Sequence, residues 1–186
     1  MQIFAQCIGL VGMALAFVSF QSKSSRGILF FQILASSVFS LHFFLLGAYT
    51  GMAMNLVGVA RNAVSYCKDK RWASGRCWMY VFIAAYLITG ILTWESVFSI
   101  FPIVAMVLST VAFWIKDANL LRLVYFPSSP CWLVYNIASR SVAGILTESF
   151  SLVSLLIAFI RFQLLGKEKK EEGNPDALVS ELQERV

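Results

Sequence analysis

Charged side chains are scarce in this chain of 186 residues, and their scarcity restricts what kind of protein it is. Asp, Glu, Lys and Arg make up 13% of the residues, hydrophobic residues make up 59%, and the mean hydropathy is +0.74. A soluble domain of this size carries about twice that charged fraction. The composition therefore excludes an ordinary water-soluble domain and predicts that most of the surface faces lipid.

Patterns for metal binding and catalysis are missing as well. The chain has one histidine, and its four cysteines are scattered at spacings that do not suit zinc. No nucleophile stands at a suggestive distance from the histidine, and the sequence has no glycine-rich phosphate loop and no carboxylate cluster. We therefore expect a protein that is not an enzyme, has no cofactor and no metal site, and keeps its cysteines as structural thiols.

What the sequence does have is seven long apolar runs. Most reach the roughly 17–25 residues that a helix needs to cross the hydrocarbon core. Strands are excluded because the runs lack two-residue alternation and an unpaired backbone is costly in lipid. The sequence predicts an all-α, polytopic membrane protein with seven transmembrane helices; 52–67 is marginal in length, and six helices is the alternative if 120–139 does not cross. The runs cover residues 3–20, 28–46, 52–67, 77–94, 97–115, 120–139 and 142–165.

Lysine and arginine gather in alternate loops between these runs. Because short loops rich in Lys and Arg stay in the cytoplasm, this bias predicts an outside N-terminus and a cytoplasmic C-terminus. The net charge of +5 then follows from topology, and nucleic acid is not expected as a partner. Residues 166–186 are predicted to be a charged, solvated cytoplasmic tail. The basic residues on the cytoplasmic side would be Lys23, Arg26, Lys68, Lys70, Arg71, Arg76, Lys116, Arg122, Lys167, Lys169 and Lys170.

The chain also repeats itself at a constant shift of 93 residues, so that 8–68 aligns with 101–161 without a gap. Apolar runs, basic loops and glycine turns keep step between the two copies. Repeats of this kind are common in membrane transporters, which place their binding site where the copies meet. The aligned identities include Val11 with Val104, Met13 with Met106, Leu15 with Leu108, Val18 with Val111, Phe20 with Phe113, Lys23 with Lys116, Ser36 with Ser129 and Gly51 with Gly144.

Each copy contains three helices, an odd number, so the copies share one orientation only if a further helix carries the chain back. The sequence therefore predicts two parallel three-helix repeats joined by a linking helix (3+1+3), with their axis along the membrane normal. The predicted regions are a first repeat at 1–68, a basic loop and linking helix at 69–96, a second repeat at 97–165 and the tail at 166–186.

A few polar and aromatic residues within the apolar runs form the candidate binding site. Polar side chains are costly inside lipid, so each one raises a functional question. The shift of 93 pairs aromatic positions on the second helices and polar positions on the third, and a two-fold arrangement would bring them together. An aromatic face with a few hydrogen-bonding groups suits a small polar solute. The candidate substrate-binding residues are Phe39, Asn55, Trp132 and Glu148, with His42 and Tyr135 as second contacts.

Several of these residues have structural alternatives. His42 alone could be a hydrogen-bond donor between helices, and Glu148 could pair with Arg140 at the outer face. Arg61 and Arg140 are either residues of the pathway or anchors at helix ends. The prolines of the stretch 126–131 are expected to kink the sixth helix, either for gating or as static packing. The candidate gating residues are Pro127 and Pro130.

The segment Leu41–Gly51, followed by Asn55, Arg61 and Asn62, resembles the YgjV-type bacterial inner-membrane proteins over nearly the whole chain. This resemblance implies an inner-membrane location. More distantly, the chain is similar to the SWEET and SemiSWEET sugar facilitators of the PQ-loop group, which are built from three-helix repeats.

In the SWEET group an aromatic residue on the second helix and an asparagine on the third contact the sugar. The resemblance implies these roles for Phe39 with Asn55 and for Trp132 with Glu148. The Pro-Gln pair of that group is replaced here, by Phe20-Gln21 and Phe113-Trp114. An acid at 148 would suit an amine, a cation or proton coupling.

We therefore expect a SWEET-like small-molecule transporter with a central pocket between the repeats, with the lipid bilayer and an unknown small polar solute as partners. The alternative is a non-transport membrane scaffold, assembly factor or sensor, with a closed centre in which the polar residues bond to one another. Whether the chain forms a homo-oligomer is left open.

Overall fold

The computed structural model describes residues 2–22, 24–112, 114–115, 120, 124, 126–154 and 156–157. Within these ranges all regular secondary structure is helical, which confirms the predicted all-α class. The chain divides into two units, Met1–Ser149 and Phe150–Val186, and the arrangement given below is that of the first. Lys23, Lys116, Arg122 and the predicted tail lie outside the described residues.

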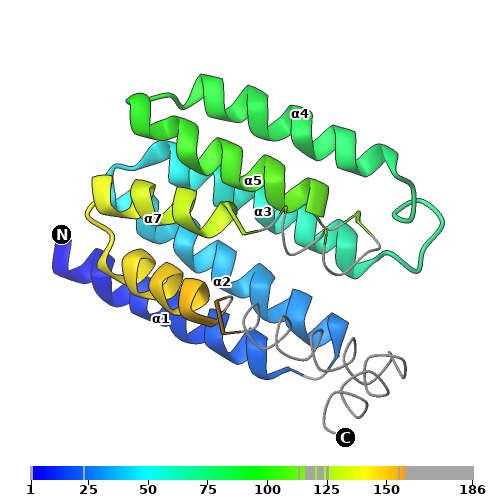
Figure 1. The fold of residues 1–186 in the computed structure, drawn as a ribbon, viewed down its shortest axis with the longest axis horizontal. Coiled ribbons are helices and arrows are strands. Elements are labelled where there is room, and N and C mark those ends of the chain that lie inside the picture. Colours follow the sequence, from blue (N-terminus) through cyan, green and yellow to red (C-terminus); the bar gives the residue numbers. More distant parts are fainter. Residues whose placement is uncertain are drawn as a thin grey trace, which may run out of the picture. The chain divides into compact units, whose positions relative to one another are not determined.

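The first three helices pack in sequence, with α2 lying along both α1 and α3 (Figure 1). The hydroxyl of Ser24 caps α2 by accepting a hydrogen bond from the Gly27 N–H at 3.0 Å. Gly47 ends α2 at φ 74°, in the left-handed region that favours glycine, and the chain turns there directly into α3. The bounds are Gln2–Gln21 for α1, Ser25–Leu46 for α2 and Tyr49–Tyr66 for α3.

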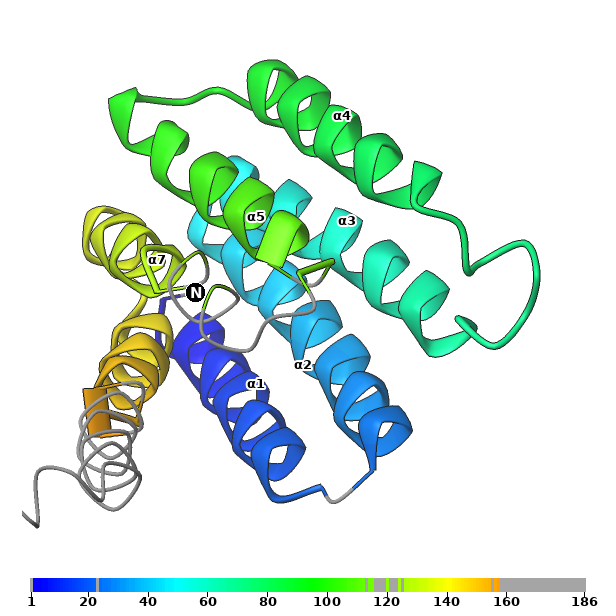
Figure 2. The ribbon, with the colours of Figure 1, turned by 45° about the vertical axis from the view of Figure 1, so that its right-hand side comes forward.

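The next two helices, α4 and α5, pack against α3. Figure 2 shows α4 and α5 beside α3, on the side away from α1, and α5 packs against α3, α4 and α7. The bounds are Cys77–Leu92 for α4, Val97–Ser99 for the 3-10 turn η1, Ile100–Ala112 for α5, Ser128–Ala138 for α7 and Val142–Ser154 for the helix after it.

The helix predicted over 120–139 is not continuous, because Phe126 and Pro127 form a turn. Its regular part, α7, begins only at Ser128, with Pro127 as its N-cap and Pro130 in its first turn. Proline fits there because the N–H groups of the first helical turn have no acceptor within the helix, so the N–H that proline lacks is not needed. Leu120 and Val124 are also helical, and Phe126 and Pro127 form a turn before α7, so the predicted kink stays a prediction. A role for the two prolines in gating stays a prediction.

Two of the described helices are long and apolar enough to cross a membrane on those grounds alone, in the stretches Gln2–Ser19 and Ser25–Leu46. Shorter apolar helices cover Cys77–Leu92, Val97–Ala112 and Val142–Ser154. The seven-span prediction is thus supported as a helical membrane fold, and the division into two repeats stays a prediction.

Two apolar clusters fill the interior of the first unit. One consists of Met54, Phe82, Tyr86, Ile103 and Met106, and the other of Phe43, Ala48 and Tyr135. Trp132 packs against both, so the two clusters are continuous. Many large apolar side chains instead point outward, as the surface of a lipid-facing bundle requires.

Candidate functional site

The four aromatic and imidazole rings of the candidate site form two matching pairs. Phe39 and His42 on α2 have ring centroids 6.0 Å apart at an interplanar angle of 78°. Trp132 and Tyr135 on α7, each 93 positions later, are 6.0 Å apart at 79°. Phe43 lies between the two pairs, 6.3 Å from Phe39 and 6.0 Å from Trp132 by ring centroids.

His42 joins three segments of the bundle. It is fully buried, with Nδ1 2.7 Å from the carbonyl oxygen of Ala5 in α1 and Nε2 2.7 Å from the hydroxyl of Ser141. Since a carbonyl only accepts, the neutral ring donates from Nδ1 and accepts from Ser141 at Nε2. The Ser141 hydroxyl in turn accepts from the Gly144 N–H at 3.1 Å.

Tyr135 makes the corresponding contact to α3. Its hydroxyl accepts a hydrogen bond from the Gly51 N–H at 2.7 Å, and its side chain is 3% exposed. Gly51 is the third residue of α3, so its N–H has no partner within the helix. Ala48, the N-cap of α3, has no side-chain oxygen to supply one. Tyr135 therefore caps α3 from another helix.

The two capping arrangements are equivalent. Ser141 and Gly144 correspond to Ala48 and Gly51 at the shift of 93. In the helix Val142–Ser154, the Gly144 N–H is bonded by the hydroxyl of Ser141, which is in turn bonded to His42. In α3, the equivalent Gly51 N–H is bonded by the hydroxyl of Tyr135.

The polar candidates on the third helices are bonded locally. The Asn55 side-chain amide donates to the Gly51 carbonyl at 2.9 Å, within its own helix. Glu148 is partly buried and interacts with the hydroxyl of Ser129 on α7. No ion pair joins Glu148 to Arg140, although both residues are described, so that suggested pairing is wrong. Arg140 instead forms an exposed turn at φ 53°.

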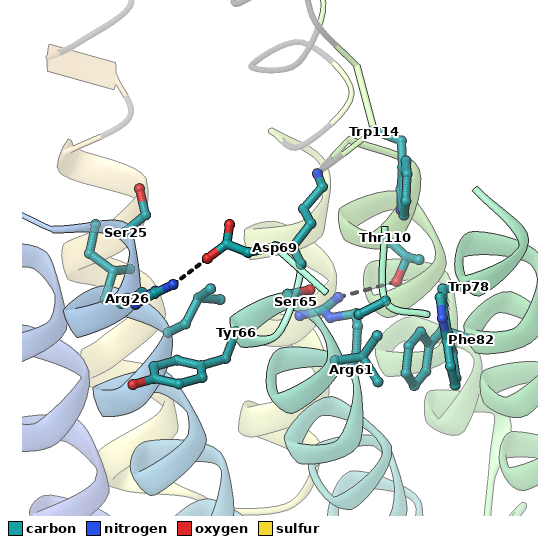
Figure 3. Close-up of a pocket in the computed structure, with 15 residues that line it drawn as sticks. Ser25, Arg26, Arg61, Ser65, Tyr66, Asp69, Trp78, Phe82, Thr110 and Trp114 are labelled. Atoms are coloured by element: carbon teal, nitrogen blue, oxygen red, sulfur yellow. Dashed lines mark hydrogen bonds and ion pairs between the residues drawn. The ribbon is translucent and has the colours of Figure 1, made fainter. Parts of the chain in front are cut away.

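Two cavities open at opposite ends of the bundle. The first, here called the basic cavity, measures about 520 Å³ and lies where α2 begins and α3 ends (Figure 3). The second, the opposite cavity, measures about 600 Å³ and lies where α2 and α7 end. The lining of the basic cavity includes Ser25, Arg26, Arg61, Ser65, Tyr66, Lys68, Asp69, Trp78, Phe82, Thr110 and Trp114.

Of the six predicted binding residues, one lines either of these cavities. Tyr135 lines the opposite cavity, and the others are absent from the described linings of both. Side chains of the two apolar clusters occupy the interior between them. The predicted central pocket stays a prediction, and the described residues do not form the alternative, a single hydrogen-bonded network among His42, Asn55 and Glu148.

Arg61 is the residue whose place the sequence left undecided. It is 9% exposed, lies in the wall of the basic cavity, and donates from Nη1 to the hydroxyls of Ser109 at 3.0 Å and Thr110 at 3.2 Å. The signal for this was a cation in a helix that otherwise holds no charge. Its partners on α5 carry no comparable signal.

A helical bundle with an apolar outer surface defines the class of integral membrane proteins. The chain matches the model of the Imp-YgjV family, described as bacterial inner membrane protein, over residues 3–165. It belongs to this family. It is similar to the inner membrane protein YgjV of Escherichia coli (strain K12), with 26% identity over 178 residues that cover 94% of each chain. No solved structure matches it.

These comparisons confirm the predicted resemblance to YgjV-type proteins and the assignment to a bacterial inner membrane family. The orientation of the termini and the likeness to SWEET facilitators stay predictions.

Proposed function

We propose that this chain is a small-molecule transporter of the bacterial inner membrane, in which two three-helix repeats enclose a pathway along their shared axis. The first repeat would comprise α1, α2 and α3. The second would comprise α5, α7 and the helix Val142–Ser154, with α4 as the link. This is the arrangement that the resemblance to SWEET facilitators implies.

The observation that carries the proposal is an exchange of contacts between equivalent positions. His42 of the first repeat contacts Ser141, at the beginning of the last helix. Its counterpart Tyr135 in the second repeat contacts Gly51, near the beginning of α3. Two copies related by a two-fold axis make reciprocal contacts of this kind. Both contacts lie at the end of the bundle that holds the opposite cavity, which favours repeats of the same orientation.

The two cavities support a pathway between the ends of the bundle. Trp132 packs against both apolar clusters, and these clusters form the layer between the two cavities. A solute would cross when the repeats rock against each other, opening one cavity toward the centre at a time. Phe39, Asn55, Trp132 and Glu148 would then become the solute contacts.

The test is flux through vesicles that contain the purified protein, with a panel of sugars, amines, amino acids and organic anions. Asn55→Ala and Glu148→Gln should each lower flux of the transported solute about tenfold, the effect of losing one good hydrogen bond in the pathway. Thr89→Ala is the matched control, because the Thr89 hydroxyl bonds the Ala85 carbonyl of its own helix at 2.6 Å, outside the pathway. It should leave flux unchanged.

No flux above that of empty vesicles for any solute, from folded protein, would reject transport. Equal flux from wild type and both pathway variants would remove Asn55 and Glu148 from the pathway while leaving a transporter.

A membrane scaffold or sensor is the second candidate, and the local hydrogen bonds of His42 and Asn55 favour it. His42 and Asn55 bond the backbone carbonyls of Ala5 and Gly51, as residues that serve packing alone would do. This candidate predicts normal stability in the flux variants above and no flux in any of them.

A further inference from the structure

The opposite cavity carries one charge of each sign. Figure 1 shows the N-terminus, the connection between α4 and α5 and the end of α7 at the same end of the bundle. The connection between α4 and α5 supplies Glu95 to the cavity lining, and the turn after α7 supplies Arg140. Both residues are exposed, and in the described part of the chain no ion pair joins them. The cavity therefore presents a carboxylate and a guanidinium as separate groups.

The turn that carries Arg140 is held from α1. The Gln6 side-chain amide donates to the Arg140 carbonyl at 2.8 Å and accepts from the Val142 N–H at 3.1 Å. Arg140 has φ 53°, a backbone conformation that favours Gly and Asn. Among the described residues, none forms a hydrogen bond or an ion pair with its guanidinium. The backbone of Arg140 is thus fixed, and its charge is left to the cavity.

Glu95 is held in a similar way from the beginning of α3. Its carboxylate oxygen Oε1 accepts from the N–H of Tyr49, the first residue of that helix, at 2.9 Å. The Glu95 N–H donates to the Ser99 hydroxyl at 3.2 Å, and this hydroxyl is bonded to that of Thr50 at 2.9 Å. A carboxylate has about four acceptor positions, and one backbone N–H occupies a single one of them. Acceptor positions of Glu95 therefore remain for a ligand.

The rest of this cavity has no net charge and is apolar on one side. Among its described lining residues, Glu95 and Arg140 are the ionised ones, so their charges cancel in the sum. The cavity measures about 600 Å³, which is large enough for a small solute. Tyr135 also lines it, so a solute there would lie beside the hydrogen bond from Gly51. The apolar side consists of Leu45, Leu46, Ala48 and Phe98.

We propose that the opposite cavity binds a small zwitterion with an apolar side chain, such as an aliphatic α-amino acid. Its carboxylate lies against Arg140, because a planar guanidinium matches a carboxylate in geometry and charge. Its ammonium donates to Glu95. A ligand with one charge leaves the opposite charge of the cavity without a partner, whereas a zwitterion pairs both. The inference rests on the proposed function only in taking this zwitterion as the transported solute; binding itself is tested without transport.

The first measurement is a calorimetric titration of the purified full-length protein in a maltoside detergent, which has no charged group. Three matched compounds are used. L-Leucine carries both charges, 3-methylbutylamine keeps the side chain with the ammonium alone, and 4-methylpentanoate keeps it with the carboxylate alone. Leucine should bind saturably and at least about tenfold more tightly than either analogue. The proposal is overturned if leucine does not bind or if one analogue binds equally well.

Neutral variants at the two charges supply the second measurement. Glu95→Gln keeps an oxygen for the Tyr49 N–H, and Arg140→Asn places a residue that tolerates positive φ, so both should fold. Each should weaken leucine binding about tenfold and remove its advantage over one analogue only. That analogue is 4-methylpentanoate for Glu95→Gln and 3-methylbutylamine for Arg140→Asn.

Arg71→Gln is the control for these variants, because Arg71 is exposed and lies outside the described lining of this cavity. It should change the affinity for leucine less than about twofold. A purely structural effect would weaken all three compounds alike, and that result overturns the site. Unchanged leucine affinity in either cavity variant, or an equal loss in Arg71→Gln, overturns it as well. If one cavity variant does not fold, the other decides.

An ammonium joined to an acidic group also occurs in the headgroup of phosphatidylethanolamine, and nanodiscs distinguish this lipid from a soluble zwitterion. Nanodiscs of phosphatidylglycerol lack the amine, and added phosphatidylethanolamine supplies it. Weaker leucine binding after the addition identifies the headgroup as the occupant; unchanged affinity identifies a soluble zwitterion. Either result supports the zwitterion site.

Vesicle flux separates this inference from the proposed function. Saturable leucine binding with the expected charge dependence, but without flux of any solute, rejects transport alone. Flux of another solute with no leucine binding rejects the zwitterion site alone.

Discussion

Replacing Tyr135 by phenylalanine deletes one hydroxyl group and leaves the ring in place. That ring is 5.8 Å from Phe43 and 6.0 Å from Trp132 by centroids, contacts that phenylalanine keeps. What is lost is the acceptor of the Gly51 N–H, 2.7 Å away in a buried site. An orphaned buried N–H costs about 1–3 kcal/mol of the free energy of unfolding. For a chain of this length each kcal/mol lowers the melting temperature by about 2–4 °C.

The expected result is therefore a fall of roughly 2–12 °C in the melting temperature of Tyr135→Phe, measured on purified protein in detergent. Tyr80→Phe is the matched control, because Tyr80 on α4 is 67% exposed and its loss of a hydroxyl orphans nothing buried. Its change should stay within about 0.5 kcal/mol. If the two variants melt at the same temperature, the Tyr135 hydroxyl does not cap α3 and the reciprocal-contact reasoning fails with it.

Three further perturbations test the same end of the bundle. Ser141→Ala should destabilise the protein by about 1–3 kcal/mol in thermal unfolding, and His42→Tyr should partly rescue it by supplying the lost hydroxyl; a double variant less stable than Ser141→Ala would contradict this. Gly144→Val should abolish folded protein in size-exclusion chromatography, because a Cβ there meets the Asn136 side chain at less than contact distance; a monodisperse variant would refute the close approach. Gln6→Leu should destabilise by about 1–2 kcal/mol, since Gln6 accepts from the Val142 N–H at 3.1 Å; unchanged melting would contradict that role.

The helices were largely predictable from the sequence, because long apolar runs are a direct consequence of burial in lipid. The predicted runs 3–20, 28–46 and 77–94 lie within three residues of the helix bounds. The start of α7 was not found, since hydropathy reports apolar content and not where a helix begins. Pro127 and Pro130, three residues apart, are a helix-start signal that hydropathy does not contain.

For the candidate site, the sequence predicted which residues correspond and not what they contact. The pairing of His42 with Tyr135 came from the repeat alone, and both residues make interhelical hydrogen bonds. Their partners include the backbone of Ala5 and Gly51, and a backbone atom leaves no trace in residue type. Arg61 was ambiguous for a related reason: its hydroxyl partners lie on α5, which only the fold brings near.

Because the helix caps are exchanged, each half of the molecule stabilises a helix end in the other half. The Gly51 N–H donates its hydrogen bond to the hydroxyl of Tyr135, and the hydroxyl of Ser141 is hydrogen-bonded to His42. A chain severed in the loop between them would leave both fragments with a frayed helix end, so the pieces should be recovered together or not at all. Each of the two fragments would thus lack the side chain from the other that completes its helix end.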